Sequence, residues 1–174
     1  MEKLRLFKYL PSVYAGDLLS KGKLLFRSLT YFRQQEDAER GDPYEGTHKD
    51  HPGTDITLES LDGRVKSVGK FAFLNTLNSD LVYVFCLSNR LDKKLMSDFG
   101  ADACIEITDV DAFQSRIRRA VMSSLKVNRK VGVLAGQVSY YDTATPTRED
   151  IQDVKKLPFF KRKEYEKQAE YRLI

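Results

Sequence analysis

The sequence predicts a single α+β domain over residues 1–174, with a mixed but mostly antiparallel sheet and a few helices. Strand-like and helix-like segments mix along the chain without the steady alternation that a parallel sheet requires. A length of 174 residues fits one domain. The apolar fraction of 41% and charged fraction of 31% are ordinary for a soluble protein, so a core of normal size can form.

The N-terminal segments predict a strand, a short helix and a second strand. Residues 4–10 alternate and are rich in aromatic and aliphatic side chains, as in a strand. Ser12 is expected to cap a helix that Gly22 ends, since serine favours helix starts and glycine the position after the last turn. Residues 23–28 then predict the second strand.

The middle of the chain predicts turns, a loop and several strands. Glycine and proline at 41–46 indicate a turn, and the polar run 47–55 predicts an exposed loop. Residues 56–61 and 64–68 flank Asp62-Gly63, which is typical of a hairpin. Residues 71–74 and 81–88 predict further strands, and the second is apolar enough to be central.

The C-terminal half predicts two helices and a closing strand. Residues 91–99 form a short helix candidate, and 103–108 a strand. Asp109 is expected to cap a helix that runs to about residue 125, with Val110, Phe113 and Ile117 on one face. Residues 131–141 indicate a strand or hairpin, 159–167 are ambiguous between helix and loop, and 169–174 predict the last strand.

No apolar run is long enough for the core of a signal peptide or for a membrane span. The sequence therefore predicts a cytoplasmic protein without a membrane partner. Its oligomeric state is left open.

Positive charge is concentrated in two segments. The net charge is +4, and residues 112–141 contain no aspartate or glutamate. Positive patches attract polyanions, so a nucleic-acid interface is one interpretation and a solvated helix face is the other. The candidate nucleic-acid-binding residues are Arg116, Arg118, Arg119, Arg129 and Lys130. A second basic group comprises Lys155, Lys156, Lys161, Arg162 and Lys163.

The acidic segment 36–45 raises the possibility of a metal site. Its carboxylates and the nearby histidines are Glu36, Asp37, Glu39, Asp42, Glu45, His48 and His51. The spacing matches neither an EF-hand nor a zinc motif, so no metal is expected, and a metal-dependent hydrolase is the weakest hypothesis. The chain also lacks the Gly-x-Ser-x-Gly, P-loop and Gly-x-Gly-x-x-Gly motifs.

Several motifs in a fixed order resemble a known bacterial family. They are Leu6-Phe-Lys-Tyr-Leu-Pro, Leu24-Leu-Phe-Arg-Ser, Asp42-Pro-Tyr-Glu-Gly, Phe85-Cys-Leu-Ser, Ala103-Cys-Ile-Glu-Ile, Val138-Ser-Tyr, Lys161 and Glu170-Tyr-Arg-Leu. Together these resemble the uncharacterised DUF2971-type family over nearly the whole chain. The sequence departs from that pattern at Gly41, where the family usually has asparagine, and at Phe99, where it often has tryptophan.

The same segments resemble, more remotely, ADP-ribosyltransferases of the DarT type. Gln168-Ala-Glu170 matches their Gln/Glu-x-Glu motif. Two departures are Lys8, where those enzymes usually have arginine or histidine, and Thr30, which does not directly follow Ser28. The resemblance implies an ADP-ribosyltransferase-like fold and NAD as a substrate. It also implies transfer to a macromolecule, with DNA or RNA as candidates, in toxin or phage-conflict biology.

The resemblance implies a role for each matching residue. Glu170 and Gln168 would be catalytic: the first would stabilise the oxocarbenium-like transition state and the second would orient the acceptor. The residues expected to hold NAD are Lys8, Tyr9, Arg27, Ser28 and Phe32.

Structural roles remain open for the same residues. Glu170 can form a salt bridge with Arg172 or Arg27, segment 42–45 can be a rigid turn, and Tyr9, Phe26 and Phe32 can be core. The competing hypothesis for the whole chain is a non-catalytic nucleic-acid-binding or adaptor domain.

Overall fold

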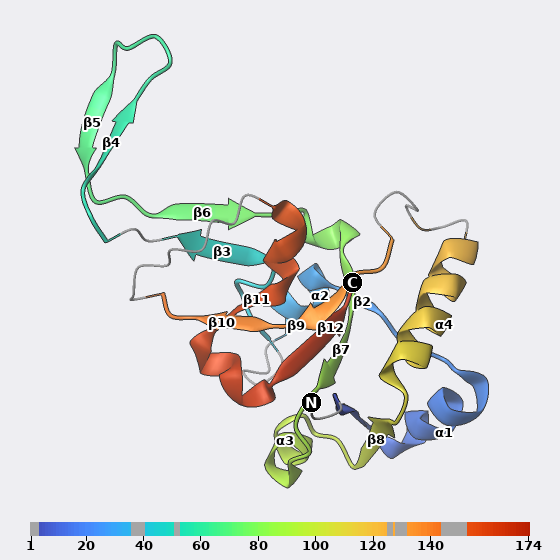
Figure 1. The fold of residues 1–174 in the computed structure, drawn as a ribbon. Coiled ribbons are helices and arrows are strands. Elements are labelled where there is room, and N and C mark those ends of the chain that lie inside the picture. Colours follow the sequence, from blue (N-terminus) through green and yellow to red (C-terminus); the bar gives the residue numbers. More distant parts are fainter. Residues whose placement is uncertain (1–3, 36–40, 51–52, 125–126, 128–131, 144–152) are drawn as a thin grey trace.

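The chain folds around a six-stranded antiparallel sheet in a computed structural model (Figure 1). The structure describes residues 4–35, 41–50, 53–124, 127, 132–143 and 153–174. The strand order is β8 (Ala103–Ile107), β1 (Leu6–Leu10), β7 (Tyr83–Ser88), β12 (Glu170–Leu173) and β9 (Ala135–Gln137), with β2 (Arg27–Ser28) also paired to β7. The predicted α+β class and mostly antiparallel pairing are confirmed.

The strand order brings the two ends of the chain together. β7, which was predicted to be central, lies between β1 from the N-terminus and β12 from the C-terminus. β12 pairs with β7 over four positions, from Glu170↔Ser88 to Leu173↔Phe85. Residues from both ends of the sequence can therefore contribute to one site on this sheet.

The sheet opens between β1 and β7. β1 pairs with β8 over five positions but with β7 at only one, Phe7↔Ser88. At the other end of β7, Val84 pairs with Arg27 of β2 instead. The first strand and the central strand therefore diverge beyond this one pair of residues.

One face of the sheet is covered by α4 (Val110–Ser123). Asp109 caps this helix as predicted, because its carboxylate accepts a hydrogen bond from the Ala112 N–H at 2.9 Å. The buried cluster between this helix and the sheet comprises Leu6, Phe85, Leu87, Val110, Ile117, Tyr171 and Leu173. Since side chains alternate along a strand, Glu170 and Arg172 point to the opposite face from Tyr171 and Leu173.

The remaining helices are short. The α-helices are α1 (Ser12–Lys21), α2 (Leu29–Arg33) and α3 (Lys93–Asp98). The 3₁₀ helices are η1 (Ser79–Leu81), η2 (Val154–Phe159) and η3 (Lys163–Gln168). Gly22 ends α1 with φ of 63° as expected, but Pro11 rather than Ser12 occupies the N-cap. The Ser12 prediction was wrong because its backbone N–H and hydroxyl both bond to Asp102 instead of capping the helix.

Three small sheets complete the fold. β3 (Thr47–Asp50) pairs with β6 (Phe73–Thr76), and β4 (Ile56–Glu59) with β5 (Lys66–Gly69) as the predicted hairpin. β10 (Ser139–Tyr141) runs parallel to β11 (Phe160–Arg162). Figure 1 shows the β4–β5 hairpin projecting from the body of the molecule.

The predicted exposed loop at 47–55 is wrong for its first four residues, which form β3. Thr47 and His48 are buried. The ring of His48 packs 4.5 Å from that of Tyr141 and 5.1 Å from that of Phe160, centroid to centroid. Packing of this imidazole against aromatic rings outweighs the polar local sequence, which suggested exposure.

Within the described part of the chain, no helix is both long enough and apolar enough to span a membrane.

Candidate functional site

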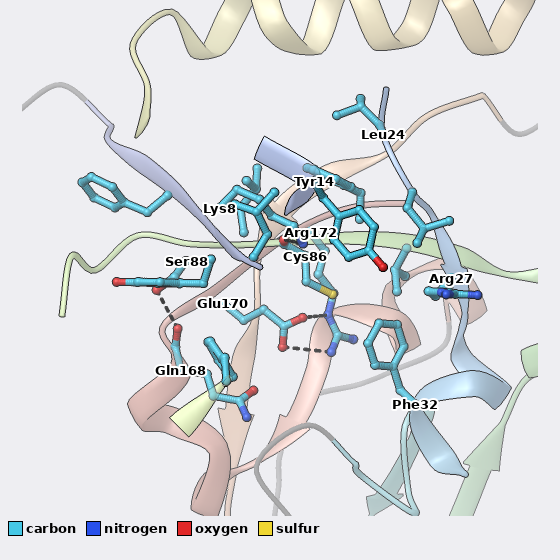
Figure 2. Close-up of a pocket in the computed structure, with 18 of the residues that line it drawn as sticks. Lys8, Tyr14, Leu24, Arg27, Phe32, Cys86, Ser88, Gln168, Glu170 and Arg172 are labelled. Carbon is cyan, nitrogen blue, oxygen red and sulfur yellow. Dashed lines mark hydrogen bonds and ion pairs between the residues drawn. The ribbon is translucent and has the colours of Figure 1, made fainter. Parts of the chain in front are cut away.

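A cavity of about 700 Å³ lies where β1 and β7 diverge. Residues 7–10 of β1 and 84–88 of β7 form two of its walls. α1, the segment 23–27 and α2 form the others, and β12 contributes Glu170 and Arg172. Figure 2 shows the Glu170 carboxylate and the Arg172 guanidinium facing each other, with Cys86 beside them. The cavity is large enough for a drug-sized or nucleotide-sized ligand.

Glu170 is a buried carboxylate held by two cations. Its Oε1 accepts from Nε of Arg172 at 2.8 Å, and its Oε2 accepts from Nη2 of Arg172 at 3.0 Å and from Nζ of Lys161 at 3.2 Å. Burial alone would raise the pKa of Glu170, but Arg172 and Lys161 hold it well below its usual range. Glu170 is therefore an anion at neutral pH, and it is unsuited to carry a proton.

Arg172 is completely enclosed and fully bonded. Only 1% of its surface is exposed. Besides Glu170, its guanidinium donates from Nη1 to Glu45 Oε1 at 2.5 Å and to the Pro158 carbonyl, and from Nη2 to Glu45 Oε2 at 3.0 Å. All five N–H donors of the guanidinium are thus used. Glu170 and Glu45 raise its pKa against the opposing effect of burial.

Glu45 reaches Arg172 from a tight turn. The turn is closed by the Glu45 N–H, which donates to the Asp42 carbonyl at 3.0 Å, and by the Tyr44 N–H, which donates to the Asp42 carboxylate at 2.9 Å. Gly46 follows with φ of +69°, and a Cβ there would lie 2.8 Å from Cδ1 of Leu29. The Asp-Pro-Tyr-Glu-Gly motif is therefore a rigid turn, and it also delivers a buried carboxylate.

Lys161 joins the two predicted catalytic residues. Its Nζ donates to Oε1 of Gln168 at 2.8 Å as well as to Glu170, and lies 3.7 Å from Oε2 of Glu45. The carboxylates of Glu170 and Glu45 raise the pKa of Lys161, although burial acts in the opposite direction. Glu45, Lys161, Glu170 and Arg172 form one buried unit of two anions and two cations, named here the ion cluster.

Gln168 lies at the end of η3, not on the closing strand that was predicted to start at 169 and to align it with Glu170. Ala169 between them has φ of 44°, a left-handed conformation that reverses the local direction of the chain. This bend brings the Gln168 and Glu170 side chains to the same ammonium group. The Gln168 carbonyl also accepts from the Ser88 hydroxyl at 2.7 Å, which ties η3 to β7.

Lys8 and Tyr9 line the N-terminal wall of the cavity. Lys8 Nζ donates to the Cys86 carbonyl at 2.8 Å and lies 4.5 Å from the centre of the Phe85 ring. Burial lowers the pKa of Lys8. The Tyr9 hydroxyl donates to the Arg90 carbonyl at 2.6 Å and accepts from the Asp92 N–H at 2.7 Å, so this hydroxyl also anchors the start of α3.

Arg27 and Phe32 also line the cavity, whereas Ser28 is not among the lining residues. Arg27 is exposed, with its guanidinium 4.5 Å from the centre of the Tyr31 ring. The Ser28 hydroxyl accepts from the Tyr31 N–H at 3.2 Å and caps α2. Ser28 therefore has a structural role as a helix cap. The other four residues predicted to contact NAD line the cavity: Lys8, Tyr9, Arg27 and Phe32.

Cys86 lines the cavity beside the Glu170–Arg172 pair (Figure 2). Burial and the neighbouring Glu170 raise the pKa of its thiol. The thiol is therefore protonated at neutral pH, and Cys86 and Cys104 are free cysteines.

The candidate nucleic-acid residues lie elsewhere. Arg116, Arg118 and Arg119 are exposed on α4, off the face that packs on the sheet. Arg129 and Lys130 lie outside the described residues. The second basic group does not form one surface, because Lys161 is buried in the ion cluster and Arg162 is half-buried beside Asp42 and Glu164, whereas Lys155, Lys156 and Lys163 are exposed.

Among the described residues, no three or more His, Cys, Asp or Glu side chains lie close enough together to hold a metal ion. Glu45 pairs with Arg172, and Asp42 lies 3.6 Å from Arg162. Glu36, Asp37, Glu39 and His51 of the metal hypothesis lie outside the described residues.

Sequence reasoning missed Glu45, Lys161 and Arg172 as members of the site. One available signal was the i, i+2 spacing of Glu170 and Arg172, which places both on one face of a strand. Nothing local to residue 45 or 161 indicates that either reaches β12. That contact depends on the positions of segments far apart in the sequence.

Comparisons of the chain with protein-family models, with curated proteins and with solved structures find no match.

Proposed function

We propose that this protein is an ADP-ribosyltransferase-like enzyme that cleaves NAD and transfers the ADP-ribose group to a macromolecule. The proposal includes the DUF2971-type assignment, the ADP-ribosyltransferase-like fold, and a role in toxin or phage-conflict biology. DNA and RNA are the candidate acceptors.

The observation that carries the proposal is the convergence of the predicted residues on one cavity. Lys8, Tyr9, Arg27 and Phe32 come from the first 32 residues, and Gln168 and Glu170 from the last seven. The shared cavity of about 700 Å³ is a suitable size for a nucleotide. Six side chains proposed on motif grounds thus line the same space.

The charges of the cavity suit the proposed reaction. Breaking the bond between C1′ of the ribose and the nicotinamide nitrogen leaves the electron pair on nicotinamide and positive charge on the ribose. An ionised carboxylate stabilises that charge in the transition state more than in the ground state. The low pKa of Glu170 suits this electrostatic role and not that of a proton acceptor. The acceptor's nucleophile then bonds to C1′ and loses its proton to solvent or a base on the acceptor.

Other lining residues suit the remaining parts of NAD. Lys8 and Arg27 supply positive charge for the pyrophosphate, and Phe32, Tyr14 and Tyr31 supply aromatic faces for the nicotinamide or adenine ring. The exposed arginines of α4 are a candidate surface for a polyanionic acceptor.

A second candidate function is nucleic-acid binding without catalysis. The observation that favours it is the exposure of Arg116, Arg118 and Arg119 on one helix, outside the cavity lining. This version requires salt-sensitive binding but no turnover of NAD.

The test is release of nicotinamide from labelled NAD, alone and with DNA, RNA or a cell lysate. Glu170→Gln keeps the shape of the side chain and removes the charge, so we expect release and label transfer to fall about a hundredfold or more. Arg27→Gln should raise KM, because this exposed residue is proposed to contact the pyrophosphate.

The matched control is Glu166→Gln, an exposed carboxylate of η3 that does not line the cavity. Its turnover should equal that of the wild type. Wild-type protein that neither releases nicotinamide nor gains thermal stability from NAD would overturn the proposal. Binding to nucleic acid in that case would favour the second candidate.

A further inference from the structure

The ion cluster connects two motifs that lie at opposite ends of the sequence. Glu45 belongs to the Asp-Pro-Tyr-Glu-Gly turn and Arg172 to the Glu-Tyr-Arg segment of β12, 127 positions apart. Both side chains are 1% exposed. Arg172 lies between two carboxylates, bonding Glu45 through Nη1 and Nη2 and Glu170 through Nε and Nη2.

Stability alone is a poor explanation for such a cluster. Removing four charged groups from water costs several kcal/mol per ion, and apolar residues of similar volume are often at least as stabilising. What the cluster adds is fixed geometry. A guanidinium with all five donors used can neither rotate nor approach one carboxylate without leaving the other.

The cluster faces the cavity. All four members line it, and Cys86 and Ser88 of β7 line it beside them. The orientation of the Glu170 carboxylate at the cavity wall is therefore set by Arg172, which bonds both of its oxygens, and by Lys161, which also bonds Oε2.

We propose that Glu45 and Lys161 are positioning residues, which hold Arg172 and Gln168 so that the Glu170 carboxylate is fixed in one orientation at the cavity wall. This rests on the proposed function of Glu170. Glu45 acts through Arg172, because it makes no hydrogen bond to Glu170 itself among the described contacts. Lys161 acts directly on Glu170 and Gln168, and so couples the two residues of the Gln-x-Glu motif.

The decisive variant is Glu45→Gln. A glutamine amide has one acceptor oxygen and carries donors where the second carboxylate oxygen was, so one of the two bonds to Arg172 is lost. The matched control is Asp42→Asn, in the same turn and also 1% exposed, which faces Arg162 instead of Arg172 and does not line the cavity. Glu45→Asp keeps the charge but shortens the side chain by one methylene.

Two measurements are made on each variant. The first is kcat and KM for nicotinamide release. The second does not depend on activity: ¹⁵N NMR of the arginine side chains, in which a locked guanidinium gives separate, slowly exchanging Nη–H signals for Arg172.

We expect Glu45→Gln to lower kcat about a hundredfold with KM changed less than about twofold, since a misplacement of about 1 Å has that scale of effect. The separate Nη–H signals of Arg172 should collapse in the same variant. Asp42→Asn should keep both kcat and the signals. Glu45→Asp should recover part of kcat. Lys161→Met should lower kcat and raise the pH at which Glu170 titrates.

The outcomes separate this proposal from the one it rests on. An active wild type with unchanged kcat in Glu45→Gln would overturn the positioning role alone. Equal losses of kcat in Glu45→Gln and Asp42→Asn would also overturn it, because the effect would then belong to the turn. A wild type that is inactive but gives the locked Arg172 signals would overturn the proposed function, and would leave the ion cluster as a structural feature.

Discussion

Two arginine–glutamate pairs in this molecule have nearly the same geometry and opposite surroundings. Arg172 bonds Glu170 at 2.8 and 3.0 Å, and Arg5 bonds Glu106 at 2.8 and 3.2 Å, in both cases through Nε and Nη2. The side chains of the first pair are 1% and 7% exposed, and those of the second 57% and 38%.

The difference lies in what else each arginine touches. Solvent screens the Arg5–Glu106 pair, so the two side chains gain little by meeting. Arg172 is buried, and its two carboxylates and the Pro158 carbonyl take every donor. The Arg172–Glu170 pair is therefore expected to matter more for stability than the Arg5–Glu106 pair. The reason is its burial and the further partners of Arg172, since the distances within the two pairs are nearly the same.

Replacing each arginine in turn is expected to give the largest difference in stability between the two pairs. Arg172→Met leaves two buried carboxylates without their main counter-charge, so we expect a loss of about 3–5 kcal/mol in the free energy of unfolding. Arg5→Met should change the urea midpoint little. Urea unfolding followed by circular dichroism measures both, and equal shifts in the two variants would contradict the role given to burial.

A smaller effect is expected in the dependence of stability on pH. The folded pKa of Glu170 is held below its ordinary value of 4.5, so its ionisation stabilises the fold above that pH. That contribution is lost progressively as pH falls from about 4.5 toward the lower folded pKa. The stability gap between wild type and Glu170→Gln should therefore narrow on acidification.

Thermal unfolding at intervals from neutral to acidic pH tests this expectation. Glu106→Gln is the exposed counterpart, and its difference from the wild type should remain small throughout. A gap between wild type and Glu170→Gln that is as wide at pH 3 as at pH 7 would contradict the assigned pKa direction.

The smallest effect on stability is expected on α4. Arg116, Arg118 and Arg119 are exposed and form no ion pair with described residues, so changing all three to glutamine should alter the unfolding midpoint only slightly. If this surface binds nucleic acid, the same variant should bind more weakly. The slope of affinity against salt should also fall, by about one for each phosphate contact removed. Unaltered binding and salt slope would exclude these arginines as the interface.

Much of the fold followed from local patterns. Four predicted features depend mainly on the conformational preferences of neighbouring residues. They are the cap at Asp109, the helix end at Gly22, the central strand at 81–88 and the hairpin around Asp62-Gly63. The expected loop at 47–55 failed because β3 gains its order from pairing with β6, more than twenty residues away.

The candidate site divides in the same way. The sequence by itself determined the closing strand that carries Glu170 and Arg172, a turn at 41–46, and the position of the α4 arginines off the face that packs on the sheet. It could not determine that the carboxylate from the turn reaches the guanidinium from β12, that Lys161 is a buried counter-ion and not a surface charge, or that a cavity opens where β1 leaves β7. Only the tertiary structure decided these, because the state of a charged side chain depends on the groups that surround it in space, and those groups come from segments that no local pattern relates.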